Sequence, residues 1–151
     1  MDLREGIKAR GLVILELRDK DGNLKSLVQS NLVTYSGLAF IAGRLMDNTQ
    51  ASPGFIAVGT TNTPAVSAQT TLLGELVRIA LASKSLGTTT VANDTVIFSG
   101  ILAEGVGTGT LTEAGIFDTA GAGLMLARTV FNPVIKSAND ILTITWKITF
   151  S

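Results

Sequence analysis

The stretch GTLTEAGIFDTAGAGLMLARTVF, Gly109–Phe131, decides the fold because it holds two apolar segments separated by a short run of small residues. Leu111–Asp118 and Leu124–Phe131 have the length and the β-forming residues typical of strands. The intervening TAGAG supplies the small residues that a tight turn needs. We therefore predict a β-hairpin. It carries three charged residues among its apolar ones: Glu113, Asp118 and Arg128.

Most of the remaining chain also indicates strands. From Leu142 to Phe150, apolar residues alternate with Thr and Lys, which predicts a long strand with a Thr face toward solvent or a partner. Near the N-terminus, DKDGN separates two apolar runs, and its Gly22 can adopt a positive φ, so a second hairpin is expected there. Further strands are predicted at Phe55–Val58, around Val77–Ala82 and within Thr88–Ala103, where Asn93 and Asp94 suggest a kink or bulge.

One segment predicts a helix. Its apolar residues recur at i, i+3, i+4, i+7 and i+8, which is the spacing of an amphipathic helix face: Leu38, Ile41, Ala42, Leu45 and Met46. Thr34 or Ser36 is suited to cap its start. Gly37 and Gly43 would allow close packing against a sheet. A short turn or helical piece is expected at 71–76.

Together these elements predict a mainly β protein. We expect an antiparallel β-sandwich of about seven or eight strands, with one α-helix at about 34–46 covering one end or edge. The 151 residues fit a single domain, 1–151, in which residues 1–30 form a hairpin available for docking.

Composition excludes several classes of function. Twelve basic and twelve acidic residues cancel, and no basic run occurs, so no nucleic-acid partner and no membrane surface is expected. The absence of His and Cys removes the commonest general base, metal ligand and thiol nucleophile. The N-terminal residues lack the apolar core of a signal peptide. Only 16% of residues are charged, against roughly 25% in typical soluble domains, which favours a subunit covered by partners.

Two motifs resemble ligand sites but fail on spacing. Asp19, Asp21 and Asn23 have the oxygen spacing that begins a calcium loop, but the twelfth position, which needs a bidentate acid, is Ser30. Gly105–Thr110, GVGTGT, lacks the Gly-Lys-Ser/Thr ending of a P-loop and precedes a strand instead of a helix. We therefore expect turns at both places, with no cofactor and no metal.

The charges of the central hairpin leave two interpretations open. An acid–base pair could be drawn from four carboxylates, but their spacing selects no pair: Glu75, Glu104, Glu113 and Asp118. If the turn is centred between Ala120 and Gly121, Glu113 and Arg128 become cross-strand neighbours. Arg78 is a second candidate partner. We favour a structural or interface ion pair over a site in which Arg128 or Arg78 binds a ligand carboxylate, and expect no catalytic residue.

Four ordered segments carry a family resemblance: NLVTYSGLAFIAGRL (31–45), FIAVGTTNTPAVSAQTTLLGELVRIAL (55–81), the stretch 109–131 and ILTITWKITF (141–150). Together they resemble small structural proteins of tailed bacteriophages, of the kinds labelled tail-fibre, baseplate, neck or minor virion components. The resemblance covers most of the chain from Asn31 onward. It does not separate fibre from collar or capsid decoration.

The resemblance implies a non-catalytic virion subunit, assembled in the bacterial host cytoplasm. Its partners would be copies of itself, often as a trimer, and other phage virion proteins. Regions expected to make these contacts are the N-terminal segment, the loop Gly59–Gln69 and the Thr face of Ile141–Phe150. The alternatives are a capsid decoration protein and, from another class, a host-surface glycan-binding module with a host receptor as partner. A glycan-degrading enzyme would need a defined carboxylate pair.

Overall fold

The computed structural model describes residues 6–46 and 50–151. This part of the chain is mainly β, as predicted, with one helix. The elements in chain order are β1 (Ala9–Arg18), β2 (Leu24–Val33), α1 (Tyr35–Leu45), β3 (Phe55–Gly59), β4 (Glu75–Ala80), β5 (Ser83–Gly87), β6 (Thr95–Leu102), β7 (Gly109–Phe117), β8 (Met125–Lys136) and β9 (Ile141–Phe150).

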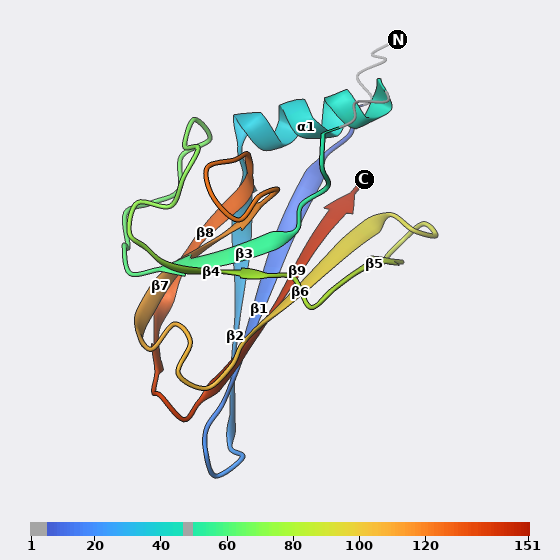
Figure 1. The fold of residues 1–151 in the computed structure, drawn as a ribbon. Coiled ribbons are helices and arrows are strands. Elements are labelled where there is room, and N and C mark those ends of the chain that lie inside the picture. Colours follow the sequence, from blue (N-terminus) through green and yellow to red (C-terminus); the bar gives the residue numbers. More distant parts are fainter. Residues whose placement is uncertain (1–5, 47–49) are drawn as a thin grey trace.

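All nine strands belong to one antiparallel sheet with the order β4-β3-β7-β8-β2-β1-β9-β6-β5. The sheet curls into a half-barrel (Figure 1), which differs from the expected two-sheet sandwich of seven or eight strands. The long strand β2 joins what would otherwise be two separate sheets. Most of it pairs with β1, but its last two residues pair with β8, through Leu32↔Arg128 and Val33↔Ala127. This short junction makes the two halves one continuous sheet.

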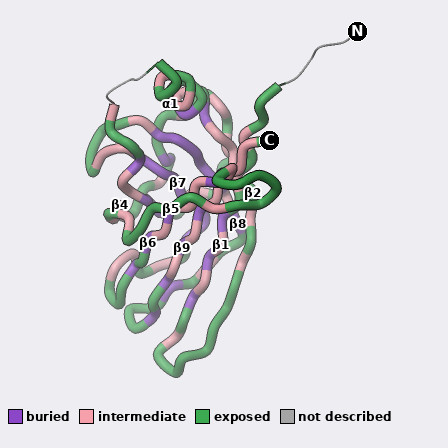
Figure 2. The backbone as a smooth tube through the Cα atoms, turned by 90° about the vertical axis from the view of Figure 1, so that its right-hand side faces the viewer, coloured by how far each residue is buried: buried purple, intermediate pink, exposed green. Residues whose placement is uncertain are grey.

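The core lies on the concave face, between the two halves of the sheet. The predicted alternation of β9 is confirmed, since its apolar side chains are buried and its Thr face is half-buried. The other half contributes Ile56, Val58 and Ile116 to the same cluster. Gly100 lets the halves approach, because a Cβ there would lie 3.1 Å from the Cδ1 of Ile56. Figure 2 shows the buried segments running along the inside of the fold.

Helix α1 forms where it was predicted, and Thr34 caps it. The Thr34 Oγ1 accepts a hydrogen bond from the Gly37 N–H at 3.0 Å and donates to the Met125 carbonyl oxygen. Gly37 is buried against β8, where a Cβ would overlap the carbonyl oxygen of Leu126. The helix therefore depends on glycine for its close contact with the sheet.

The face of α1 that packs on the sheet is not the predicted one. Gly37 and Phe40 are buried and Ile41 is half-buried, whereas Leu38 and Leu45 of the predicted core face point outward. The residues of α1 are apolar on nearly every side, so their spacing alone could not identify the buried face. The close approach of Gly37 to the backbone of β8 determines which face of α1 is buried.

Two further segments differ from expectation. Of the turn or helical piece expected at 71–76, the chain forms bends at 71 and 73–74 and no helix, and β4 already begins at Glu75. The segment 83–102 holds two strands, β5 and β6. Asn93, with φ of 63°, and Asp94 lie in the turn between them, not in a kink within one strand. The count of nine strands includes β5, whose polar sequence gave no strand pattern.

Candidate functional site

Glu113 and Arg128 form an ion pair with both side chains fully buried. The Arg128 Nη2 and Nε donate to the Glu113 Oε2 at 2.8 and 3.0 Å. The register differs from the predicted one, since Glu113 lies opposite Val130 and Arg128 opposite Gly115. The difference arises next to the turn, where β8 carries an extra residue between the pairs Phe117↔Met125 and Ile116↔Ala127. The two residues are thus diagonal neighbours across the hairpin.

The pair also holds a long loop, which the sequence did not indicate. Glu113 accepts hydrogen bonds from the Gly74 N–H at 2.7 Å and the Leu73 N–H at 3.3 Å. Arg128 donates to the Gln69 Oε1 at 2.9 Å and to the Thr63 carbonyl oxygen at 3.0 Å. Both charges therefore bind segment 60–74, the anchored loop, as well as each other.

The anchored loop lies on the convex face of β3, β7 and β8. Ala57 and Phe117 neighbour the core residues Ile56 and Ile116 in sequence but point to the opposite side, where they form a second small cluster with Leu72 and Met125. Gly115 leaves room for this packing, since a Cβ there would lie 3.0 Å from the Leu72 Cδ2. The predicted contact loop Gly59–Gln69 is thus partly a cover for the sheet.

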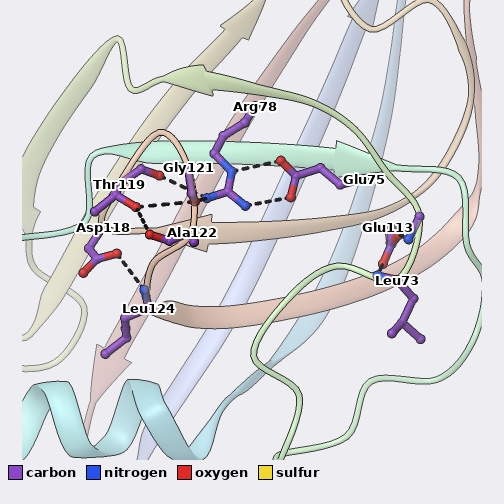
Figure 3. A network of polar contacts seen from close by, with 10 residues as sticks. Leu73, Glu75, Arg78, Glu113, Asp118, Thr119, Gly121, Ala122 and Leu124 are labelled. Atoms are coloured by element: carbon purple, nitrogen blue, oxygen red, sulfur yellow. Dashed lines mark hydrogen bonds and ion pairs between the residues drawn. The ribbon is translucent and has the colours of Figure 1, made fainter.

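Arg78 does not pair with Glu113. Its Nη2 lies 2.7 Å from the Glu75 Oε2, and its Nη1 donates to the carbonyl oxygens of Thr119 and Gly121 (Figure 3). Its guanidinium carbon stacks over the Phe117 ring, 3.6 Å from the ring centre. Arg78 therefore ties the turn between β7 and β8 to β4.

Asp118, the third charged residue of the central hairpin, supports the same turn. Its Oδ1 accepts from the Leu124 N–H at 2.7 Å, and its Oδ2 accepts from the Gln50 side chain at 3.0 Å. Three of the four candidate carboxylates, Glu75, Glu113 and Asp118, are thus engaged in structural contacts. What these contacts do is hold loops in place.

The remaining candidate sites show the same use of polar groups. Asp19 accepts the backbone N–H groups of Asp21 and Asn23, both at 2.9 Å, and Gly22 has φ of 83°, as the predicted turn requires. Buried Lys136 donates to the Ala103 carbonyl oxygen at 2.9 Å, and burial lowers its pKa.

Within residues 6–46 and 50–151, no three His, Cys, Asp or Glu side chains gather as a metal site. No helix in these ranges is long and apolar enough to cross a bilayer.

The features that sequence reasoning missed are surfaces. Helix α1 exposes a continuous apolar face, with Leu45 82% and Leu38 50% exposed, followed by an exposed Met46. Between α1 and the strands β5, β6 and β9 lies an apolar groove of about 360 Å³. Its lining includes Phe40, Ile41, Leu86, Val96, Phe98 and Ile148. The all-round apolar composition of α1 was the available signal for the first surface.

The N-terminal hairpin, predicted as a docking element, has two distinct parts. Strands β1 and β2 occupy the middle of the sheet order, and Val13 and Leu15 belong to the core. The tip around residues 18–26 is exposed. Outside the tip, the strands still expose Leu12 and Val28 on the outer surface of the hairpin.

Comparisons of the chain with protein-family models, curated proteins and solved structures gave no match.

Proposed function

We propose that this chain is a non-catalytic structural subunit of a tailed-phage virion, which assembles with copies of itself and docks to other virion proteins. The observation that carries the proposal is the outward face of α1. In the helix YSGLAFIAGRL, Arg44 is the single charged residue, and a helix that is apolar on all sides is normally buried. A large exposed apolar surface of this kind marks an interaction site.

Two further points support a structural role. The buried charges Glu113 and Arg128 are used to fix loops, as expected for a rigid building block. The four sequence segments that resemble phage structural proteins include α1, the anchored loop and the central hairpin. One of these segments, α1, is the element that presents the exposed apolar surface.

The glycan-binding alternative has less support. Sugar-binding surfaces use exposed aromatic rings. Among the large exposed hydrophobic side chains of the described residues, Tyr35 is the one aromatic, and Trp146 is fully buried. Subunit docking is therefore the function that the surface supports best.

The test is substitution of the α1 face. Leu45→Glu places a charge on the apolar surface without touching the core, so it should lower the oligomer fraction in light scattering while the melting temperature stays unchanged. Ile135→Glu is the matched control, because Ile135 is also well exposed but lies on β8 outside the expected contact regions. Equal behaviour of the two variants, or a wild-type chain that is monomeric and absent from purified virions, would refute the proposal.

A further inference from the structure

We propose that two copies of this chain pair through β5, antiparallel about a two-fold axis at Ser85, so that their sheets join edge to edge. This inference rests on the oligomeric subunit proposed above and names the strand through which copies meet. It concerns a different surface from the outward face of α1.

The first argument is that β5 has an open edge. It ends the sheet order, and β6 is its hydrogen-bonded neighbour. β4, at the other end of the sheet, packs against β6 across the opening of the half-barrel, whereas the extensive strand contacts of β5 in the described residues are with β6 alone. Figure 1 shows β5 at the outer margin of the fold. An edge strand presents unpaired backbone N–H and C=O groups, and another strand is the partner that satisfies them together.

The second argument is that the sequence of β5, SKSLG, is complementary to itself in the antiparallel register centred on Ser85. With the axis at Ser85, each Lys84 lies opposite Leu86 of the second copy, and Ser83 lies opposite Gly87. The lysine stem can then pack on the leucine. With the axis at Lys84, two like charges would face each other directly, which is unfavourable. Charge therefore disfavours the register centred on Lys84, and the register centred on Ser85 gives each lysine stem a leucine to pack on.

The third argument is that this register covers exposed apolar surface. Leu86 is 60% exposed, and its side chain lines the groove below α1 together with Lys84. Their cross-strand partners on β6 are Val96 and Phe98, which also line the groove. Lys84 and Leu86 of the second copy would lie on the same side of the joined sheet. Pairing thus places additional side chains over the mouth of the groove.

Cross-linking tests the register directly, because the natural chain contains no cysteine. In Ser85→Cys the two introduced Cβ atoms would face each other at about 4.5–5.5 Å, within reach of a disulfide or a short bis-maleimide after small adjustment. In Ser83→Cys they would be offset by four residues, roughly 14 Å along the strands at about 3.4 Å per residue. We expect a covalent dimer from Ser85→Cys and almost none from Ser83→Cys, with both variants melting like wild type.

A charge-swap experiment provides an independent readout. Ser85→Asp and Ser85→Lys should each lower the dimer fraction, because like charges would meet on the axis, and mixing the two variants should restore it. Equal cross-linking at positions 83 and 85, or no restoration on mixing, would overturn pairing through β5. If the wild-type chain is oligomeric in that case, the proposed subunit role stands and the contact lies elsewhere. A wild-type chain that is monomeric by light scattering would overturn pairing through β5, and its absence from purified virions as well would overturn the subunit role.

Discussion

Removing Glu113 should release the anchored loop as well as destabilise the fold. In Glu113→Ala, Arg128 stays buried without its counter-charge, and the N–H groups of Leu73 and Gly74 lose their acceptor. Breaking a buried ion pair by removing one partner costs about 3–5 kcal/mol. The orphaned amides add about 1–3 kcal/mol each only if the loop stays in place. Because the loop can open to water instead, we expect Glu113→Ala to lower the free energy of unfolding by about 3–5 kcal/mol in total.

Urea denaturation and thermal denaturation measure the loss of stability, and hydrogen exchange measures the release of the loop. At about 2–4 °C per kcal/mol for a chain of this size, the melting temperature should fall by roughly 6–20 °C. Backbone amides of the anchored loop should lose protection before those of β9. Glu75→Ala is the control, since the pair of Glu75 with Arg78 is partly exposed and worth about 0–1 kcal/mol. A loss below about 1 kcal/mol for Glu113→Ala, with unchanged exchange in 60–74, would refute the anchoring role.

Three further results are expected. Gly37→Ala should lower the free energy of unfolding by about 1–3 kcal/mol in urea titrations, because its Cβ would overlap the Leu126 carbonyl oxygen. Backbone N–H groups of Val91 and Thr90 hold the pKa of Asp94 below the ordinary 3.8, so its carboxyl resonance should titrate below that value. Wild type should therefore have a larger free energy of unfolding than Asp94→Asn. This difference should have its full value above pH 3.8 and should shrink as the pH falls toward the lower pKa of the folded state. Trp146, the single tryptophan, is fully buried, so its emission should be blue-shifted and should move to the red on unfolding.

Local patterns predicted the elements better than the way they assemble. The alternation through Trp146 predicted β9 and its buried face, and Thr34, one of the two candidate caps, is where α1 starts. The strand β5 was missed because an edge strand with exposed Ser and Lys has no apolar alternation. The single sheet was missed because it depends on two residue pairs between β2 and β8, which leave no mark in either segment.

The central ion pair shows the same limit. Proximity of Glu113 and Arg128 followed from the symmetry of the hairpin, but the irregular pairing beside the turn, between Ile116 and Phe117, shifted their register. Their other partners, such as Gly74 and Gln69, come from a loop about forty to sixty residues away in sequence. Charge-bearing residues in one hairpin cannot identify partners at that distance, because the backbone groups of Leu73 and Gly74 carry no residue-specific signal and Gln69 is one of many uncharged polar residues in the chain.

The position of β9 in the sheet also constrains how the protein is made. β9 lies between β1 and β6, so strands from the two ends of the chain are neighbours in the middle of the sheet. During synthesis, β1 and β2 can form their hairpin early, but β1 has no second neighbour until β9 leaves the ribosome. Until then one edge of β1 stays open to other nascent chains. Such long-range pairing is slow to form and exposed to aggregation, so completion of the sheet waits on β9.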